Sequence, residues 1–134
     1  MKKTIASAAI ILFSVQALAQ SDWINIASLP GDSKKLDVQP GSFEFSKTKG
    51  GTPIAVVVGK ITDTKSANIS LYKWYVSLED CQRKMGKVVS LNVNGEFAFE
   101  NDFVFGSGSI ATVMAETICG VAEFSLAEKK KKSL

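Results

Sequence analysis

The hydrophobic period of this sequence changes once, at Ser109, and that change constrains the fold more than any other feature. From Ser21 onwards apolar and polar residues alternate, which is the period of a β-strand. After Ser109 the spacing of apolar residues becomes that of a single helical stripe, formed by Ile110, Val113, Met114, Thr117, Ile118 and Val121. The pattern predicts an α+β fold: an antiparallel sheet of about six strands, with one C-terminal helix packed on it.

Turn signals divide the alternating part into strands. We expect strand residues at 23–26, 35–38, 43–46, 54–61, 69–78, 88–93 and 97–99, with a short helical turn within 79–86. Asn94-Gly95 separates two alternating runs, so residues 87–100 are predicted to form a hairpin. Because both residues tolerate a positive φ, the expected turn is type I′.

The C-terminal helix is expected to begin at an N-cap, Ser109, after a flexible Gly106-Ser107-Gly108 segment. Small residues flank its apolar stripe and would let it lie close to a sheet. The helix ends at Gly120 or continues to Phe124. We interpret residues 127–134 as a basic, flexible and solvated tail, which leaves residues 20–126 as a single domain.

The first nineteen residues have the order of a bacterial secretory signal peptide. Lys2 and Lys3 precede a short apolar run, and Ala17-Leu18-Ala19 has the form of a cleavage site. Gln20 would follow the cut, so the cysteine that carries a lipid anchor is missing there. No second apolar segment is expected to reach membrane-spanning length, so no transmembrane segment is predicted. We therefore expect a periplasmic or secreted protein.

The two cysteines, Cys81 and Cys119, are predicted to form a disulfide, because an even count in an exported chain favours pairing. Closing a loop of this length stabilises a domain by about 4 kcal/mol in the chain-entropy model. A redox pair or a metal pair is the alternative. The spacing is not Cys-x-x-Cys and the chain has no histidine, which disfavours both.

Composition argues against catalysis and against nucleic-acid binding. Without histidine the commonest general base is missing, and neither a Ser-His-Asp arrangement nor the usual zinc site can be built. Without its signal and the run Lys129 to Lys132 the chain carries ten basic and thirteen acidic residues, too acidic for a phosphate-backbone surface. We expect no enzyme activity, no metal and no cofactor. The carboxylates that could form a pair are expected to be solvated surface: Glu79 with Asp80, or Glu96, Glu100 and Asp102.

Two features could form an interaction surface. Tyr72 and Trp74 are predicted on one face of their strand and Tyr75 on the other. One face must be core, so the other is either exposed or covered. The second feature is the run Lys129, Lys130, Lys131 and Lys132. It is either a solubilising end or a site of electrostatic docking on acidic lipid headgroups or sulphated polymers.

Several of these motifs resemble the bacterial surface-adhesin protein E-like family. They are Trp23 soon after the signal, the Trp-bearing strand that leads into Asp80-Cys81, and the helix from Ile110-Ala111 to Ile118-Cys119. The resemblance implies a small antiparallel sheet, a C-terminal helix and a Cys81–Cys119 bridge. The family's namesake type is a surface lipoprotein that attaches to host matrix proteins. This chain departs from it by lacking the lipidated cysteine.

Export, a disulfide and the missing catalytic residues favour a non-enzymatic binding module, with an adhesin-like role, attachment to host or envelope macromolecules, as the form that the resemblance implies. Its partner would be a protein or an envelope or matrix macromolecule. The sequence leaves the choice between a monomer and a homodimer open. The alternative is a small periplasmic inhibitor of a hydrolase such as lysozyme. Only the loop 106–109 could then enter an active site, and its glycines predict that it is floppy.

Overall fold

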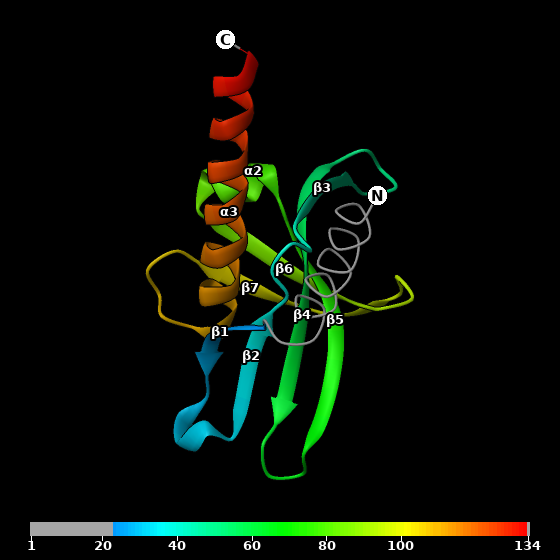
Figure 1. Cartoon of the computed structure of the whole chain (residues 1–134), viewed down its shortest axis with the longest axis vertical. Coiled ribbons are helices and arrows are strands. Elements are labelled where there is room, and N and C mark those ends of the chain that lie inside the picture. The colour runs from blue at the N-terminus through cyan, green and yellow to red at the C-terminus, as the bar shows by residue number, and fades with distance from the viewer. Residues whose placement is uncertain (1–22, 134) are drawn as a thin grey trace, which may run out of the picture.

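The structure, a computed structural model, describes residues 23–133 and consists of one antiparallel sheet with a long helix on one face (Figure 1). This confirms the predicted α+β class. The sheet has seven strands in the order β1-β2-β4-β5-β6-β7, and β3 pairs with the free part of β4. The predicted signal peptide, residues 1–19, lies outside the described residues.

The elements follow the predicted order. They are β1 (Ile24–Ser28), the 3₁₀ turn η1 (Pro30–Asp32), β2 (Lys34–Val38), β3 (Glu44–Lys47), β4 (Pro53–Asp63), β5 (Asn68–Ser77), α2 (Leu78–Arg83), β6 (Met85–Asn92), β7 (Phe97–Val104) and α3 (Ile110–Ser133). Every strand pair is antiparallel, which is the arrangement that short turns between consecutive strands permit.

The central pair β4–β5 supplies most of the core face of the sheet. Ala55 and Val57 of β4 and Trp74 and Val76 of β5 are buried on the side that α3 covers. The indole of Trp74 lies flat against the backbone of Gly59, where a Cβ would overlap its ring atoms. Gly59 is thus needed for close approach of a large side chain, not for a turn.

The β6–β7 hairpin is confirmed, but the predicted type I′ turn is wrong. Gly95 has φ 93°, whereas Asn94 is absent from the non-glycine residues with positive φ. The Gly95 N–H donates to the Asn92 carbonyl at 2.8 Å, which closes a turn from Asn92 to Gly95. Gly95 itself is the left-handed residue at the end of this turn. The Asn94 side chain accepts from the Glu96 N–H at 3.0 Å and thereby favours this longer loop.

Helix α3 begins as predicted and ends later than predicted. The Ser109 hydroxyl accepts from the Thr112 N–H at 3.1 Å, which is the N-cap bond. The helix then passes through both Gly120 and Phe124 and continues to Ser133. A single glycine costs about 1 kcal/mol in a helix interior, and the Ala-, Glu- and Lys-rich residues beyond it are strong helix formers.

The basic segment 127–134 is therefore not a separate flexible tail. Through Ser133 it is the last part of α3, and the ammonium of Lys129 lies 5.0 Å from the ring centroid of Phe45 in β3. A cation over an aromatic face is attracted by the ring quadrupole, so this contact fastens the end of the helix to the sheet.

By length and composition α3 could also cross a membrane, so the expectation that no second segment reaches that length is wrong. The span Ile110–Lys131 contains a stretch long enough to cross a bilayer, with a mean hydropathy of 1.4. Nevertheless Ala115, Ile118, Cys119 and Ala122 are buried against the sheet. This stripe, together with the disulfide, gives α3 the role of a core helix.

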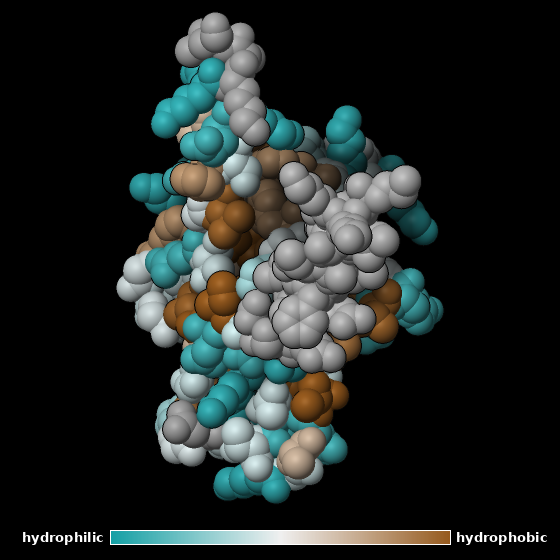
Figure 2. Space-filling view, in the orientation of Figure 1, coloured by the Kyte–Doolittle hydropathy of each residue, from teal (hydrophilic) through white to brown (hydrophobic). Residues whose placement is uncertain are grey.

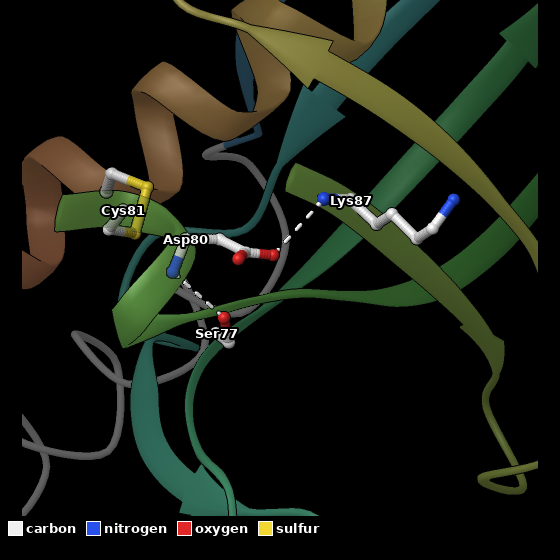
Figure 3. The surroundings of a disulfide bond; sticks show 5 residues. Ser77, Asp80, Cys81 and Lys87 are labelled. Carbon is white, nitrogen blue, oxygen red and sulfur yellow. Dashed lines mark hydrogen bonds between the residues drawn. A yellow bond between two sulfur atoms is a disulfide. The ribbon is translucent and has the colours of Figure 1, made fainter. Parts of the chain in front are cut away.

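The predicted disulfide is present and joins α2 to α3 (Figure 3). Its Cα atoms are 5.5 Å apart, and both cysteines are buried. The short helix α2 is held on both sides: the Ser77 hydroxyl accepts from the Asp80 N–H at 3.0 Å, and the Asp80 carboxylate accepts from the Lys87 N–H at 3.3 Å. Cys81 is thereby positioned at the end of β5, where the middle of α3 passes.

Replacing either cysteine by serine should lower the free energy of unfolding by similar amounts, about 4 kcal/mol from the chain entropy of the closed loop. The double variant should be no less stable than either single variant, because partners in one bond are not additive. Thermal and urea unfolding of oxidised protein would measure this. Additive losses in the double variant would contradict it, as would two free thiols in the mass spectrum of exported protein.

Gly59→Ala and Gly120→Ala should change stability in opposite directions. A Cβ at position 59 would overlap the Trp74 indole, and overpacking of this kind costs roughly 1–3 kcal/mol. A Cβ at position 120 meets no atom within 4 Å, so the helix should gain up to about 1 kcal/mol. Urea unfolding of both variants compares them, and equal signs would contradict the packing described for Trp74.

Candidate functional site

The face of the sheet opposite α3 holds a groove with a volume of about 440 Å³. Among residues 23–133 no helix lies on this face (Figure 1). The groove crosses the sheet from β3 to β7. Its lining residues are Ser42, Glu44, Ser46, Lys47, Thr48, Lys49, Ile54, Val56, Val58, Lys73, Tyr75, Leu91, Gly95 and Phe97.

Strand register explains why these side chains meet. Val56 pairs with Tyr75, and Glu44 pairs with Val56, so one row of cross-strand neighbours runs from β3 to β5. Beside it, Val58 pairs with Lys73, Lys73 with Leu91, and Leu91 with Phe97. Directly opposed residues have their Cβ atoms about 5 Å apart, so the two rows bring the apolar side chains into one floor, with Lys73 inside the second row between Val58 and Leu91.

The charges around this floor are mostly positive. Lys47, Lys49 and Lys73 line the groove, and Glu44 is the one acidic side chain among its lining residues. Within the described part of the chain, the ion pairs involve Lys60 and Lys87, and none involves these three lysines. The groove therefore combines an apolar floor with unneutralised cations, which favours ligands that are both apolar and anionic.

The three aromatic residues predicted as an interaction surface are separated by the fold. Trp74 is fully buried under α3, so its assignment to an exposed surface is wrong. Tyr72 shares that face; it is half-buried and lies edge-on to Phe99, with 5.4 Å between ring centroids. Tyr75 alone lies in the groove. Strand alternation sends neighbouring residues to opposite faces, and the helix covers the side of Trp74.

Sequence reasoning missed the other apolar residues of the groove, although a signal for them was present. The run 54–61 in β4 is apolar at nearly every position instead of at alternate positions. Such a run indicates that both faces of a strand are apolar. Here Ala55 and Val57 face the core, whereas Val56 and Val58 face the groove.

The predicted lysine cluster lies away from the groove floor, on the last turns of α3. Lys129 contacts Phe45, as described above, and Lys131 is exposed. The helix therefore presents Lys129, Lys130, Lys131 and Lys132 as part of an ordered element, with the side chain of Lys132 outside the described residues. The fold does not bring this cluster together with Tyr72 and Trp74.

The loop between β7 and α3 is better anchored than its glycines predict. The buried Thr112 hydroxyl donates to the Val104 carbonyl at 2.9 Å and bonds the hydroxyls of Ser107 and Ser109 at 2.7 and 2.9 Å. The Gly106 N–H donates to the Glu116 carboxylate at 3.1 Å. The expectation of a floppy segment is therefore wrong, because side chains of α3 satisfy its polar groups.

Four of the candidate carboxylates, Asp80, Glu96, Glu100 and Asp102, have structural partners. Lys87 bonds Asp102 at 2.7 Å and lies 3.4 Å from Glu100. The hydrogen bond to Asp102, and then the one to Glu100, raise the pKa of the Lys87 ammonium. Asp80 holds α2 against β6, as shown in Figure 3. Over the described range 23–133, no three or more histidine, cysteine or carboxylate side chains are grouped to hold a metal ion.

A second hollow, of about 430 Å³, lies on the helix side of the sheet. It is bounded by β2, β4, β7 and the first turns of α3, with Leu36, Ile61, Phe99 and Met114 in its wall. Leu36 and Met114 belong to the hydrophobic core and Ile61 packs against it, whereas Phe99 is exposed at the margin. We therefore assign this hollow to packing between the helix and the sheet.

No protein-family model matches this chain, and neither the curated proteins nor the solved structures contain a match to it. The resemblance to the surface-adhesin protein E-like family therefore stays a prediction drawn from its motifs around Cys81 and Cys119.

Thr112→Val should loosen the β7–α3 loop while preserving the shape of the core. Valine keeps the volume but leaves the Val104 carbonyl and two serine hydroxyls without their common partner. Because Val104 and both serines are exposed, the loss is that of a hydrogen bond water can replace, roughly 0.5–1.5 kcal/mol. Amide hydrogen exchange at Val104 and Thr112 should accelerate. The matched control is Thr117→Val, because Thr117 bonds only the Val113 carbonyl of its own helix. Equal exchange rates in both variants would contradict the anchoring role.

Proposed function

We propose that the protein is a non-enzymatic binding module whose ligand surface is the groove on the open face of its sheet. The occupant we propose is an extended segment of a partner protein that carries both apolar side chains and carboxylates. The observation that carries the proposal is the floor formed by Val56, Val58, Tyr75, Leu91 and Phe97 beside three lysines that form no ion pair with another residue of the range 23–133.

The apolar floor supplies an energetic reason for binding. Phe97 is 60% exposed, although it lies beside Leu91 in the sheet. Burying such a side chain contributes roughly 1.5–3 kcal/mol, and an exposed patch of joined apolar residues is typical of an interaction site. The lysines that line the groove add selectivity, because they attract carboxylates and repel basic segments.

Export and the missing histidine support a binding role over an enzymatic one. The Cys81–Cys119 bridge suits an oxidising compartment, consistent with the predicted periplasmic or secreted location. Attachment to a host or envelope macromolecule is the adhesin-like form of this proposal, and it agrees with the motif resemblance. General acid–base catalysis by histidine has no residue to perform it.

A short synthetic peptide in which leucine or phenylalanine alternates with glutamate should bind the groove. In a ¹⁵N-labelled titration, the amide signals of Tyr75, Leu91 and Phe97 should shift with one saturation curve. Leu91→Ser should weaken the affinity about tenfold through lost apolar burial. Lys73→Glu should weaken it by about fivefold, the value of an exposed charge pair.

Matched controls lie elsewhere on the same sheet. Ile69→Ser removes an apolar side chain that is 60% exposed, like Phe97, but outside the groove. A peptide with lysine in place of glutamate keeps the apolar pattern and reverses the charge. The proposal fails if Leu91→Ser and Ile69→Ser have equal effects, or if the acidic and basic peptides bind equally.

The second candidate, inhibition of a hydrolase such as lysozyme, is favoured by one observation. Gly106, Ser107, Gly108 and Ser109 are exposed, and the bonds to Thr112 and Glu116 hold the loop in one shape. A protruding loop of fixed shape is what entry into an active site requires. A lysozyme turnover assay with excess protein tests it, with Thr112→Val as the loosened variant, and undiminished turnover rejects lysozyme as the target.

A further inference from the structure

We propose that the C-terminal end of α3 docks the protein on a membrane surface that carries anionic lipid headgroups. The proposal is independent of the groove, which lies on the other side of the sheet. It rests on three observations about the part of α3 that follows the disulfide: its position, its exposed apolar side chains and its lysines.

The end of α3 projects from the molecule. Cys119 is fixed to α2, and fourteen more helical residues follow it, from Gly120 to Ser133. At the rise of an α-helix they extend about 20 Å. Figure 1 shows this end standing beyond the sheet. It can therefore reach a flat surface that the rest of the molecule does not touch.

The projecting segment carries apolar side chains that the core does not use. Phe124 is 66% exposed, Leu126 47% and Val121 38%. Figure 2 shows hydrophobic and hydrophilic side chains side by side over this helix. Gly120 lies on the same exposed segment, and no atom lies within 4 Å of the place where its Cβ would be, so packing within the described chain gives no reason for a glycine there.

The lysines follow these apolar residues directly. Lys129, Lys130, Lys131 and Lys132 form the last helical turn before Ser133, against two acidic residues, Glu123 and Glu128, in the same segment. The Lys129–Phe45 contact holds this part of the helix beside β3. Clustered lysines near an anionic bilayer each strengthen binding, over a distance limited by salt screening.

The combination of apolar and basic residues selects a membrane over a soluble polyanion. A helix that lies in a bilayer interface buries aromatic and aliphatic side chains at the acyl boundary, while its lysines remain among the headgroups. Phe124 and Val121, three residues apart, share one outer face of α3, and a sulphated polymer would use the lysines and leave both in water. The exposed Phe124 therefore distinguishes the two occupants.

The experiment is flotation of the disulfide-bonded mature chain with two kinds of vesicle: phosphatidylcholine alone, and phosphatidylcholine with about one third phosphatidylglycerol. We expect binding to the second kind and release at high salt. The double variant Lys131→Glu and Lys132→Glu should reduce the partition coefficient about thirtyfold or more. Phe124→Ser should reduce it about tenfold, because an apolar side chain no longer enters the interface.

Two controls match these variants. Lys34→Glu with Lys35→Glu makes the same change of charge on β2, and these residues pair with Asp63 and Thr62 at the other end of β4. Ile69→Ser removes a side chain as exposed as Phe124 from β5. Both controls should partition like the unaltered chain. Melting temperatures of all variants identify any that are unfolded, and Phe124→Ala then replaces a failed serine variant.

Three results would overturn the proposal. The first is equal partition of the lysine variant and its control on β2. The second is equal partition of the Phe124 and Ile69 variants, which indicates that the helix end does not enter the interface. The third is retention on heparin that depends on the lysines without binding to vesicles, which assigns the cluster to a sulphated polymer. Variants of the groove should leave vesicle binding unchanged, so the two proposals fail separately.

Discussion

The packing of α3 on the β4–β5 face, fixed by the Cys81–Cys119 bridge, is the constraint on which the rest of the structure depends. Small side chains such as Ala115 and Ala122 let the helix approach the sheet, and Trp74 fills the space beneath it by lying against Gly59. One helix covers one face of a sheet. The opposite face, with its groove, therefore lies outside the core formed by the described residues.

The same constraint separates the two surfaces that we assign to binding. The groove uses the side chains of β4, β5 and β6 that alternate with the core residues, so its floor is as precisely placed as the core itself. The projecting end of α3 exists because the bridge joins the helix to α2 at its tenth residue, and beyond it the described residues hold the helix to the sheet through the buried Ala122 and the Lys129–Phe45 contact. One surface is thus concave and rigid, and the other convex and basic.

The turn at Asn94-Gly95, the end of α3 and the β7–α3 loop differ from what the sequence predicts, and each difference has a physical cause. The Asn94 side chain bonds the Glu96 backbone, which replaces the expected type I′ turn by a longer loop. Gly120 costs a helix too little to end it when strong helix formers follow. The glycines of the β7–α3 loop suggested flexibility, but Thr112 lies eight residues from Val104 and still accepts its N–H, at 3.3 Å. Each of these outcomes depends on partners that a local pattern does not contain.

By itself, the sequence determined the α+β class, the positions of the strands along the chain, the N-cap at Ser109 and the pairing of its two cysteines, because periodicity, capping and an even cysteine count act locally or leave one choice. It did not determine which face of the sheet the helix would cover. That choice belongs to the tertiary structure, since Ile54 to Ile61 is apolar towards both faces. Once α3 covers the side of Trp74 and Val57, Tyr75 and Val56 are left on the open side, and only then do residues from β3 to β7 form a single groove.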